Sequence, residues 1–485
     1  MKKGVKIGDD MSAKYAYLFP YEYVPKGSRI IIYGAGEVGQ EYLQQMLMTS
    51  YAEVICFLDR AYDKYPSMII PILPPDKVVD FDFDYVVIAM KTAIFCGDVS
   101  RYLQSKGVSE KQIIHIGVRG KCGSLYLGEY AENAENLDYA YQKAPLSIAL
   151  KFGPGLGDAV IKKRLFKEIV TMAPEAKIDI YTPGGAKFIK SFYADEPNLN
   201  CAIDDGGVRY AKHHKEYGLS MSIFFMIQID HIEYEKLNKI APLFAKQMQL
   251  HAKRHSEYGL SPFPTVQNHL HFRRAMYLGR NCYTLYDYTD VFHVDDQKVN
   301  IPLQEECRGA YEALSLGQYV TFNYGNGAAG KNNKSLISKQ WPKEYFVEFV
   351  KLFKERFPRI ALVQLGDNHT EPIENVDTIL FGKDLEIVKY ILKGSLLHLD
   401  IEGGLMHLAT QLGTKCAVIY GPTQVELFSY PQNINIVSYT CKDCYLLYPE
   451  YYKCARGLEK PVCMWEIRPE RVMAEVEAYL EGVAR

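Results

Sequence analysis

The sequence predicts an α/β protein built from three successive units of alternating strands and helices. The apolar runs RIIIY, LSIALKF and YVTFN, one at the start of each unit, have the length of buried strands, and amphipathic stretches with helical spacing follow them. In the first two units a glycine-rich turn joins the first strand to its helix. Because strands that alternate with helices form parallel sheets, we expect a parallel sheet in each unit.

The composition is that of a globular protein and excludes several classes of function. The 485 residues are 48% hydrophobic and 24% charged, and a net charge of −2 gives no electrostatic basis for binding nucleic acid. No apolar run reaches the roughly 18 to 20 residues that a membrane span needs, and the N-terminal stretch lacks the apolar core of a secretory signal. Apart from a C-terminal group, the 11 cysteines are scattered, some of them in apolar strands as at Cys56 and Cys416, so we expect reduced thiols and a cytoplasmic protein.

The first unit, residues 1–118, has the pattern of a small dinucleotide-binding fold. Gly34, Gly36 and Gly39 form G-x-G-x-x-G between a strand and a helix, and Asp59 ends the next strand. Such glycines let a pyrophosphate approach the helix N-terminus, and such an acid binds a ribose hydroxyl. The alternative is that the glycines only permit a tight turn and close helix packing. The unit has the length of half a dinucleotide fold, so NAD is not expected.

The second unit spans residues 146–315 and follows a polar linker at residues 119–145. Its first strand leads into KFGPGLGDAV, where Asp158 stands at the start of a helix. A carboxylate at such a turn can act as a general base toward an attacking hydroxyl group. It can alternatively serve only to cap the free backbone N–H groups of the helix.

The third unit, residues 316–485, carries a polar turn inside the apolar stretch LDIEGGLMHLATQLG. Backbone N–H groups at a helix N-terminus, behind two glycines, can bind a diphosphate and stabilise its charge without a metal ion. His407, in the first turn of that helix, can donate a hydrogen bond to a phosphate, or it can be a core histidine that bonds a backbone carbonyl. The candidate ligand-binding residues of this turn are Glu402, Gly403, Gly404 and His407.

Four cysteines near the C-terminus have the spacing of a tetrathiolate metal site. Cys441 and Cys444 form C-x-x-C, and Cys454 and Cys463 follow. A metal held there would be structural, because four thiolates leave no open coordination position. Sulfur ligands alone do not choose between zinc and iron. Free thiols and disulfides are the alternatives.

Four motifs in this order resemble glycosyltransferase family 9, the family of the ADP-heptose:lipopolysaccharide heptosyltransferases. They are GLGDAV, KQWPKEYFVEFVKLF, GGLMHLATQLGTKCAVIYGPT and CKDC, and the resemblance covers residues 146–485. It implies the GT-B architecture, in which two Rossmann-like domains, here 146–315 for the acceptor and 316–485 for the donor, face each other across a cleft. The first unit lies outside this region and resembles Rossmann-like sugar-nucleotide modules appended to bacterial glycan enzymes.

The resemblance implies an inverting glycosyltransferase that uses a nucleotide-diphosphate donor and needs no metal for catalysis. Asp158 matches the family's proposed base, and Lys339 matches a lysine that contacts the donor diphosphate, with a solvated surface charge as the alternative. The family's donor segment aligns with residues 402–409, where Glu402-Gly403 replaces the usual Asp-Ser. Related protein heptosyltransferases use a four-cysteine iron site, which keeps iron beside zinc. Further donor-site candidates are Gly421, Thr423 and Asn323, although GPT at 421–423 can be a simple turn.

The transferred sugar is expected to be heptose or a related sugar, and the acceptor a bacterial surface glycan such as the lipopolysaccharide core, or a protein. These acceptors place the enzyme in the cytoplasm or at the inner face of the inner membrane, and a homo-oligomer is compatible with the sequence. Two other functions stay open. One is a non-catalytic nucleotide-sugar-binding protein, and the other is an NAD-dependent sugar-nucleotide oxidoreductase or epimerase that works through the first unit.

Overall fold

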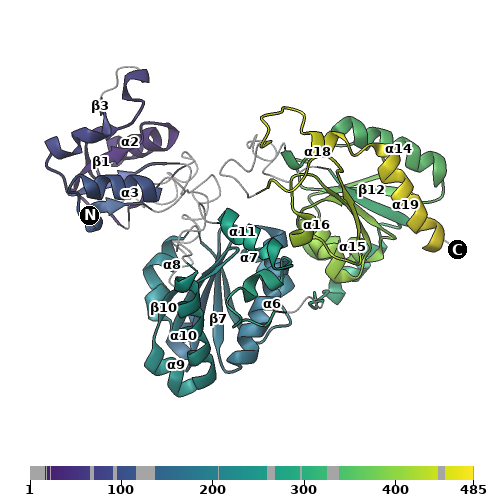
Figure 1. The fold of residues 1–485 in the computed structure, drawn as a ribbon, viewed down its shortest axis with the longest axis horizontal. Coiled ribbons are helices and arrows are strands. Elements are labelled where there is room, and N and C mark those ends of the chain that lie inside the picture. Colours follow the sequence, from purple (N-terminus) through teal and green to yellow (C-terminus); the bar gives the residue numbers. More distant parts are fainter. Residues whose placement is uncertain are drawn as a thin grey trace, which may run out of the picture. The chain divides into compact units, whose positions relative to one another are not determined.

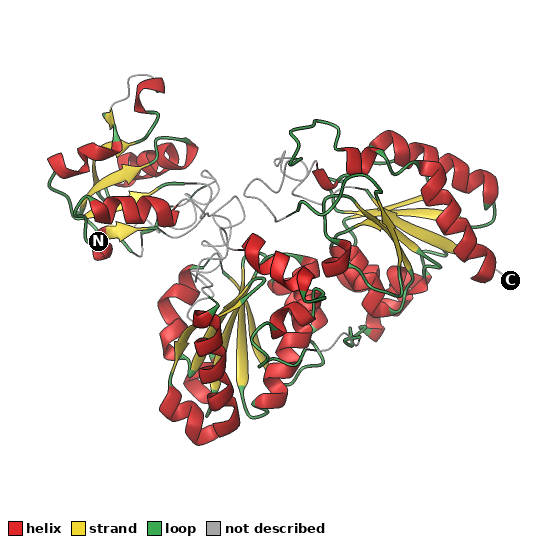
Figure 2. Ribbon diagram, in the orientation of Figure 1, coloured by secondary structure: helices red, strands yellow, loops and turns green. Residues whose placement is uncertain are grey.

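The described part of the chain forms three sheets, each accompanied by helices (Figure 1, Figure 2). The computed structural model describes residue 17 and residues 19–21, 23–65, 70–90, 96–115, 137–205, 207–258, 268–294, 298–324, 338–445 and 454–483. By its internal packing the chain divides into two compact parts, which differ from the three units defined by the sequence. One comprises Met1–Lys143, Asp179–Ala186 and Cys201–Glu216, and the other comprises Ala144–Ile178, Lys187–Asn200 and Tyr217–Arg485.

The first sheet has the order β3-β2-β1-β4-β5, with parallel pairing between its neighbours. Alternate residues of β1 enter two separate apolar clusters, Ile30 and Ile32 in one and Ile31 and Tyr33 in the other, as the two-residue period of a strand requires. Both faces of this sheet are therefore covered. Its elements are β1 (Arg29–Tyr33), α2 (Glu37–Thr49), β2 (Glu53–Leu58), β3 (Ile72–Leu73), β4 (Tyr85–Ile88), α3 (Cys96–Ser105) and β5 (Ile113–Ile114), with short 3-10 turns at Tyr62–Lys64, Pro75–Asp80 and Glu110–Gln112.

The second sheet has the order β10-β9-β6-β7-β8. Its strand β9 pairs parallel with β6 but antiparallel with β10. Only three residues, 224–226, connect β9 to β10, and so short a connection can join only antiparallel neighbours. The elements of this part are α5 (Ala140–Lys143), β6 (Ser147–Phe152), α6 (Leu156–Met172), β7 (Lys177–Thr182), α7 (Ala186–Phe192), β8 (Leu199–Asp204), α8 (Val208–His213), β9 (Leu219–Ile223), β10 (Ile227–Ile232), α9 (Tyr234–Ile240), α10 (Pro242–Glu257) and α11 (Asn268–Tyr277), with 3-10 turns at His214–Glu216 and Thr284–Asp287.

The third sheet has the order β13-β12-β11-β14-β15-β16, and its neighbours pair parallel throughout. The C-terminal helix α19 packs with α14 over a core that contains the fully buried Trp341. The elements are a 3-10 turn at Glu305–Cys307, α12 (Arg308–Glu312), β11 (Tyr319–Asn323), α14 (Lys343–Arg356), β12 (Ala361–Gly366), β13 (Thr378–Phe381), α15 (Leu385–Gly394), β14 (His398–Ile401), α16 (Gly404–Leu412), β15 (Cys416–Tyr420), α17 (Val425–Phe428), β16 (Ile434–Val437), α18 (Val462–Trp465) and α19 (Pro469–Val483).

The three sheets share one strand order. Counted along the chain, each places its third, second, first, fourth and fifth strands side by side, and the third sheet adds a sixth. This is the doubly wound order, which confirms the α/β class expected from the sequence. In the third sheet the order reverses between β11 and β14, and ligands of such sheets bind at the carboxyl ends of strands at that point. Within the described part of the chain, no helix is both long and apolar enough to cross a membrane.

Candidate functional site

Glu402 occupies the turn between β14 and α16, at the switch point of the third sheet. Its carboxylate is buried and accepts from three donors. Lys339 Nζ and Thr423 Oγ1, the latter at 3.2 Å, donate to Oε2, and His407 Nε2 lies 3.4 Å from Oε1. Thr423, Lys339 and His407, singled out separately from the sequence, therefore meet on one carboxylate.

The charges of this turn compensate each other. Burial alone would raise the pKa of Glu402, but the charge of Lys339 and the hydrogen bond from His407 lower it to about 2. Burial acts to lower the pKa of Lys339, and Glu402 and Tyr445 more than offset it, so that this pKa is raised. The ammonium of Lys339 also lies 4.4 Å from the ring centroid of Tyr445. Lys339 is thus an enclosed, paired cation, which disfavours the reading of a solvated surface charge.

Asp158 lies in the first turn of α6, which starts after the N-cap residue Gly155. Its carboxylate packs over the glycine turn, because a Cβ atom added to Gly155 would lie 2.7 Å from Oδ2. Lys162, one helical turn later, places Nζ 2.5 Å from Oδ1 of Asp158. The lysine side chain is fully buried, whereas that of Asp158 is 36% exposed. Lys162 was not singled out from the sequence, although its spacing of four residues from an acid on a helix was an available signal.

Two glycines bring the first turns of α6 and α16 into contact. A Cβ atom on Gly157 would lie 2.9 Å from Cδ2 of His407, and one on Gly404 would lie 3.1 Å from Cβ of Leu156 and 3.2 Å from the nitrogen of Gly157. The turn that carries Asp158 and the turn that carries His407 are therefore neighbours. Because the free N–H groups and the positive dipole end of a helix lie in its first turn, two such ends meet here and favour an anion.

The remaining third-unit candidates lie around this turn in different ways. Gly403 is the extended N-cap residue of α16. Gly421 is a packing position, because a Cβ atom there would lie 2.1 Å from Sδ of Met464. Asn323, at the end of β11, donates from Nδ2 to Oδ1 of the fully buried Asp400 at 3.2 Å. Asn323 thus supports β14 beneath the turn.

The glycine turn of the first unit is held by its own acid. Asp59 Oδ2 accepts from the backbone N–H of Ala35 at 2.8 Å, and Oδ1 accepts from that of Ala61 at 2.8 Å. Gly34 has a φ of +107°, and a Cβ atom on Gly39 would lie 2.0 Å from the Gly34 oxygen, so both glycines are required by the fold. Gly36 faces open space. These contacts favour the structural interpretation of the turn, and the ribose contact of Asp59 stays a prediction.

The oxidoreductase alternative would use a tyrosine and a lysine spaced as Tyr-x-x-x-Lys on a helix. Tyr102 and Lys106 have this spacing, and the Lys106 ammonium lies 5.6 Å from the Tyr102 ring centroid. Helix α3 ends at Ser105, however, so the lysine follows the helix rather than lying on it.

The four cysteines predicted as metal ligands lie within the described residues. Among the described residues, which include Cys441, Cys444, Cys454 and Cys463, no group of three or more potential ligands could hold a metal ion. The thiols are free and still influence each other. Burial, followed by the other three cysteines, raises the pKa of Cys463 to about 12. The zinc or iron site expected from the spacing stays a prediction.

Two kinds of comparison found similar proteins, one for the first unit and one for most of the chain. The family model described as C2185-like, N-terminal, matches residues 26–114. No protein of curated function matches the chain. Among solved structures, the ADP-heptose lipopolysaccharide heptosyltransferase II of E. coli is 14% identical with a TM-score of 0.44, covering 70% of this chain and 100% of that one.

Two further solved structures are similar over the same share of the chain. The glycosyl transferase family 9 protein of Veillonella parvula DSM 2008 is 16% identical with a TM-score of 0.43, covering 70% of this chain and 98% of that one. The dodecameric, iron-containing glycosyltransferase TibC of enterotoxigenic E. coli H10407 is 11% identical with a TM-score of 0.46, covering 70% and 77%. At such identities and TM-scores the similarity does not define the activity of this chain.

Proposed function

We propose that the chain is an inverting glycosyltransferase that moves a sugar from a nucleoside-diphosphate donor to a hydroxyl group. The observation that carries this proposal is the contact between the first turns of α6 and α16 through Gly157, Gly404 and His407. It puts a partly exposed carboxylate, Asp158, on the turn that adjoins a helix N-terminus suited to a diphosphate. In this proposal residues 146–315 bind the acceptor and residues 316–485 bind the donor.

The two turns divide the chemistry between them. Asp158 takes the proton of the acceptor hydroxyl as that oxygen attacks the sugar carbon, on the face opposite to the leaving diphosphate. The transition state resembles an oxocarbenium ion, and the departing diphosphate gains negative charge. The N–H groups of the α16 first turn and the ammonium of Lys339 stabilise that charge. Glu402 holds Lys339 in place before the donor arrives and shares it with the diphosphate afterwards.

The donor sugar of the proposal is heptose or a related sugar, and the acceptor is a bacterial surface glycan or a protein. Glu402-Gly403 replaces the Asp-Ser of the family that the sequence resembles, and the longer acid reaches Lys339. The proposed site of action is the cytoplasm or the inner face of the inner membrane.

Asp158→Asn tests the base, since it keeps the size of the side chain and removes its proton-accepting charge. We expect sugar transfer to fall by about 100-fold or more, the usual contribution of a general base. Binding of the donor, measured by the thermal shift that it causes, should stay near that of the wild type. Radiolabelled sugar transfer to a panel of acceptors measures the rate.

The substitution also leaves the buried ammonium of Lys162 without its partner. The double variant Asp158→Asn/Lys162→Met removes that charge and separates loss of the base from loss of folding. Glu348→Gln, on the solvated side of α14, serves as the control. Loss of donor binding together with transfer in the double variant would assign Asp158 a structural role.

One observation favours a non-catalytic nucleotide-sugar-binding protein as the second candidate. Both acids that face the proposed site are paired with lysines, Asp158 with Lys162 and Glu402 with Lys339. A carboxylate that already accepts from an ammonium has fewer lone pairs free for an incoming hydroxyl group. A wild-type protein that binds nucleotide sugars but transfers or hydrolyses none of a broad panel would select this candidate.

A further inference from the structure

A continuous chain of hydrogen bonds leads away from Glu402 through the core. His407 joins Glu402 to the hydroxyl of Tyr430, which lies 2.8 Å from Nδ1 of the imidazole. The Tyr430 hydroxyl lies 2.5 Å from that of Tyr283, and the Tyr283 hydroxyl lies 2.7 Å from Nε2 of Gln411. All four side chains between Glu402 and the far end of the chain belong to buried residues.

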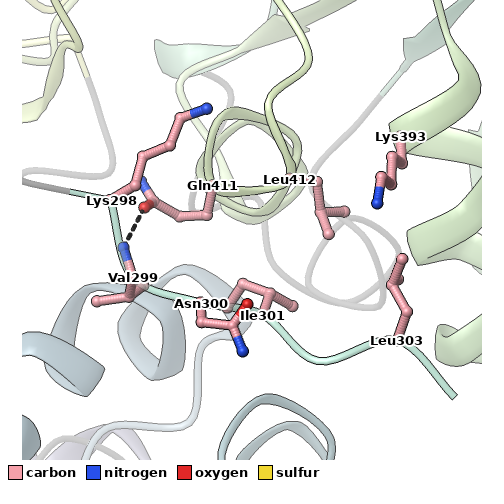
Figure 3. Close-up of a pocket in the computed structure, with 8 residues that line it drawn as sticks. All are labelled: Lys298, Val299, Asn300, Ile301, Leu303, Lys393, Gln411 and Leu412. Carbon is pink, nitrogen blue, oxygen red and sulfur yellow. Dashed lines mark hydrogen bonds between the residues drawn. The ribbon is translucent and has the colours of Figure 1, made fainter.

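This series of hydrogen bonds ends on the segment of the polypeptide that connects the second and third sheets. Oε1 of Gln411 accepts from the backbone N–H of Val299 at 3.0 Å (Figure 3). We call residues 298–303 the connecting segment. It has no secondary structure of its own and precedes the elements of the third sheet.

Every hydrogen bond in this series donates in the same direction, from Val299 toward Glu402. A backbone N–H can only donate, so the amide oxygen of Gln411 faces Val299 and its NH₂ group donates to Tyr283. Tyr283 then donates to Tyr430, so the hydroxyl proton of Tyr430 is left for its other partner, Nδ1 of His407. With Nδ1 as acceptor, the imidazole carries its proton on Nε2, which faces Glu402.

Packing holds the middle of this chain from a second side. The guanidinium of Arg164, from α6, lies 4.0 Å from the ring centroid of Tyr283. The rings of Tyr283 and Tyr430 lie 5.6 Å apart, and that of Tyr430 lies 5.5 Å from His407. A buried and fully connected polar chain of this kind fixes one arrangement of its members, because an unmade bond in it is costly.

The connecting segment is held by two buried lysines and borders a pocket. Lys163 Nζ donates to the oxygen of Asn300 at 2.8 Å, and Lys389 Nζ donates to that of Pro302 at 2.5 Å. Beside the bond between Val299 and Gln411 lies a pocket of about 320 Å³ (Figure 3). The segment and the ends of α15 and α16 line it, which leaves space next to the point where the chain of hydrogen bonds ends.

We infer that Tyr430, Tyr283 and Gln411 are positioning residues that hold His407 with its Nε2 proton directed at Glu402, and that they link this turn to the amide of Val299. The inference rests on the proposed function only for what the turn binds. The bond geometry and the form of His407 do not depend on it. Glu402 is the last acceptor in this series of hydrogen bonds. A ligand that draws His407 or Lys339 away from Glu402 therefore also alters the hydrogen bond at Val299, in the connecting segment.

The first test uses the protein without any ligand. Selective ¹⁵N labelling of histidines, with His407→Gln to assign the signal, is expected to show a protonated Nε2 and an unprotonated, hydrogen-bonded Nδ1 at His407. Tyr430→Phe removes the donor to Nδ1 and should shift that nitrogen signal. Tyr286→Phe is the matched control. Tyr286 is as buried as Tyr430 and lies in the 3-10 turn that follows Tyr283, but its hydroxyl donates to the oxygen of Phe224, outside these hydrogen bonds. A proton on Nδ1 in the wild type would overturn the inference.

The second test measures hydrogen exchange of the peptide that contains Val299, with ADP and UDP as separate probes. Gln411→Leu should speed exchange at Val299 by about tenfold, the effect of one lost hydrogen bond. A bound probe should change the exchange of Val299 in the wild type and in Tyr286→Phe, but not in Tyr430→Phe. A bound probe that alters Val299 equally in Tyr430→Phe would contradict the link. If neither probe binds, the proposed donor class is wrong, while the imidazole signal and the Gln411→Leu exchange still decide the inference.

Discussion

Glu402 and Lys339 form a buried ion pair, and its stabilising effect depends on pH. Folding lowers the pKa of Glu402 from 4.5 to about 2, so its contribution is complete above about pH 4.5 and is lost as the pH falls toward 2. Folding raises the pKa of Lys339 above 10.5, so that contribution is complete below pH 10.5 and is lost at higher pH. The pair therefore stabilises the fold between these limits, which include neutral pH.

Glu402→Gln should destabilise the protein by about 3 to 5 kcal/mol at pH 7, because it leaves the ammonium of Lys339 buried without a counter-charge. The gap between wild type and variant should narrow as the pH falls from 4.5 toward 2, where Glu402 itself becomes protonated. Urea unfolding at pH 7 and pH 3 measures both free energies.

Glu426→Gln is the control for this prediction, since Glu426 pairs with Lys442 on the surface, where such a pair contributes roughly 0 to 1 kcal/mol. A difference between Glu402→Gln and wild type that is the same at both pH values would show that charge is not the cause.

The polar residues of the α16 turn could be found in the sequence, but their partners could not. Glu402 and His407 stand out because they interrupt an apolar run. Tyr283 comes from an irregular stretch, Tyr430 from a loop after α17, and Gln411 from the buried end of a helix. Nothing in the local pattern of these three distinguishes them from ordinary core residues, because their role is set only by tertiary contacts.

At the scale of elements, the first turns of α6 and α16 approach so closely that Gly157 and Gly404 have no room for a side chain of their own. The strands and helices of each unit, and the glycine turns of the first two, were predictable, since each has its own periodic pattern or breaker residues. The contact between the two turns was not, because it joins positions far apart in the chain. The antiparallel β10 was likewise hidden, since an edge strand has the same two-residue period in either direction.

Gly157→Ala should disturb this contact, because its Cβ atom would lie 2.9 Å from the ring of His407. We expect the imidazole to move and donor affinity to fall by about tenfold, the effect of roughly one lost hydrogen bond. Isothermal titration with the donor nucleotide measures the affinity.

The matched control for the glycine prediction is Gly482→Ala in α19, where an added Cβ atom meets nothing within 4 Å. That change should leave affinity unchanged and stabilise the helix by about 0.5 to 1 kcal/mol. Equal effects of the two substitutions on affinity would argue against a specific contact at Gly157.

At the scale of the whole molecule, the first sheet has apolar clusters of its own. Both clusters draw all their members from residues 17–114. A separate core of this kind supports cooperative unfolding that does not depend on the rest of the chain. The C2185-like match, residues 26–114, contains this core except for Tyr17, Phe19, Tyr21 and Val24.

Calorimetry of the full chain should therefore show two unfolding transitions. A nucleoside diphosphate that binds at the α16 turn should raise the midpoint of one and leave the other in place, because a ligand stabilises only the part that binds it, by about 2.7 kcal/mol at 100 times its Kd. Adenosine, which lacks the diphosphate, is the control for ADP. A single transition that moves as a whole would contradict two independently unfolding parts.

Gly157 and Gly404 also constrain how this sequence can diverge. A Cβ atom at Gly157 would meet the ring of His407, and one at Gly404 would meet Leu156 and the backbone of Gly157, so a substitution at either position is tolerated only after the two turns have moved apart. The two glycines are therefore expected to be retained or replaced together during evolution, although they lie far apart in the sequence. A protein in which either glycine was replaced would have a different arrangement of residues around His407. Its preference among donors would change as well.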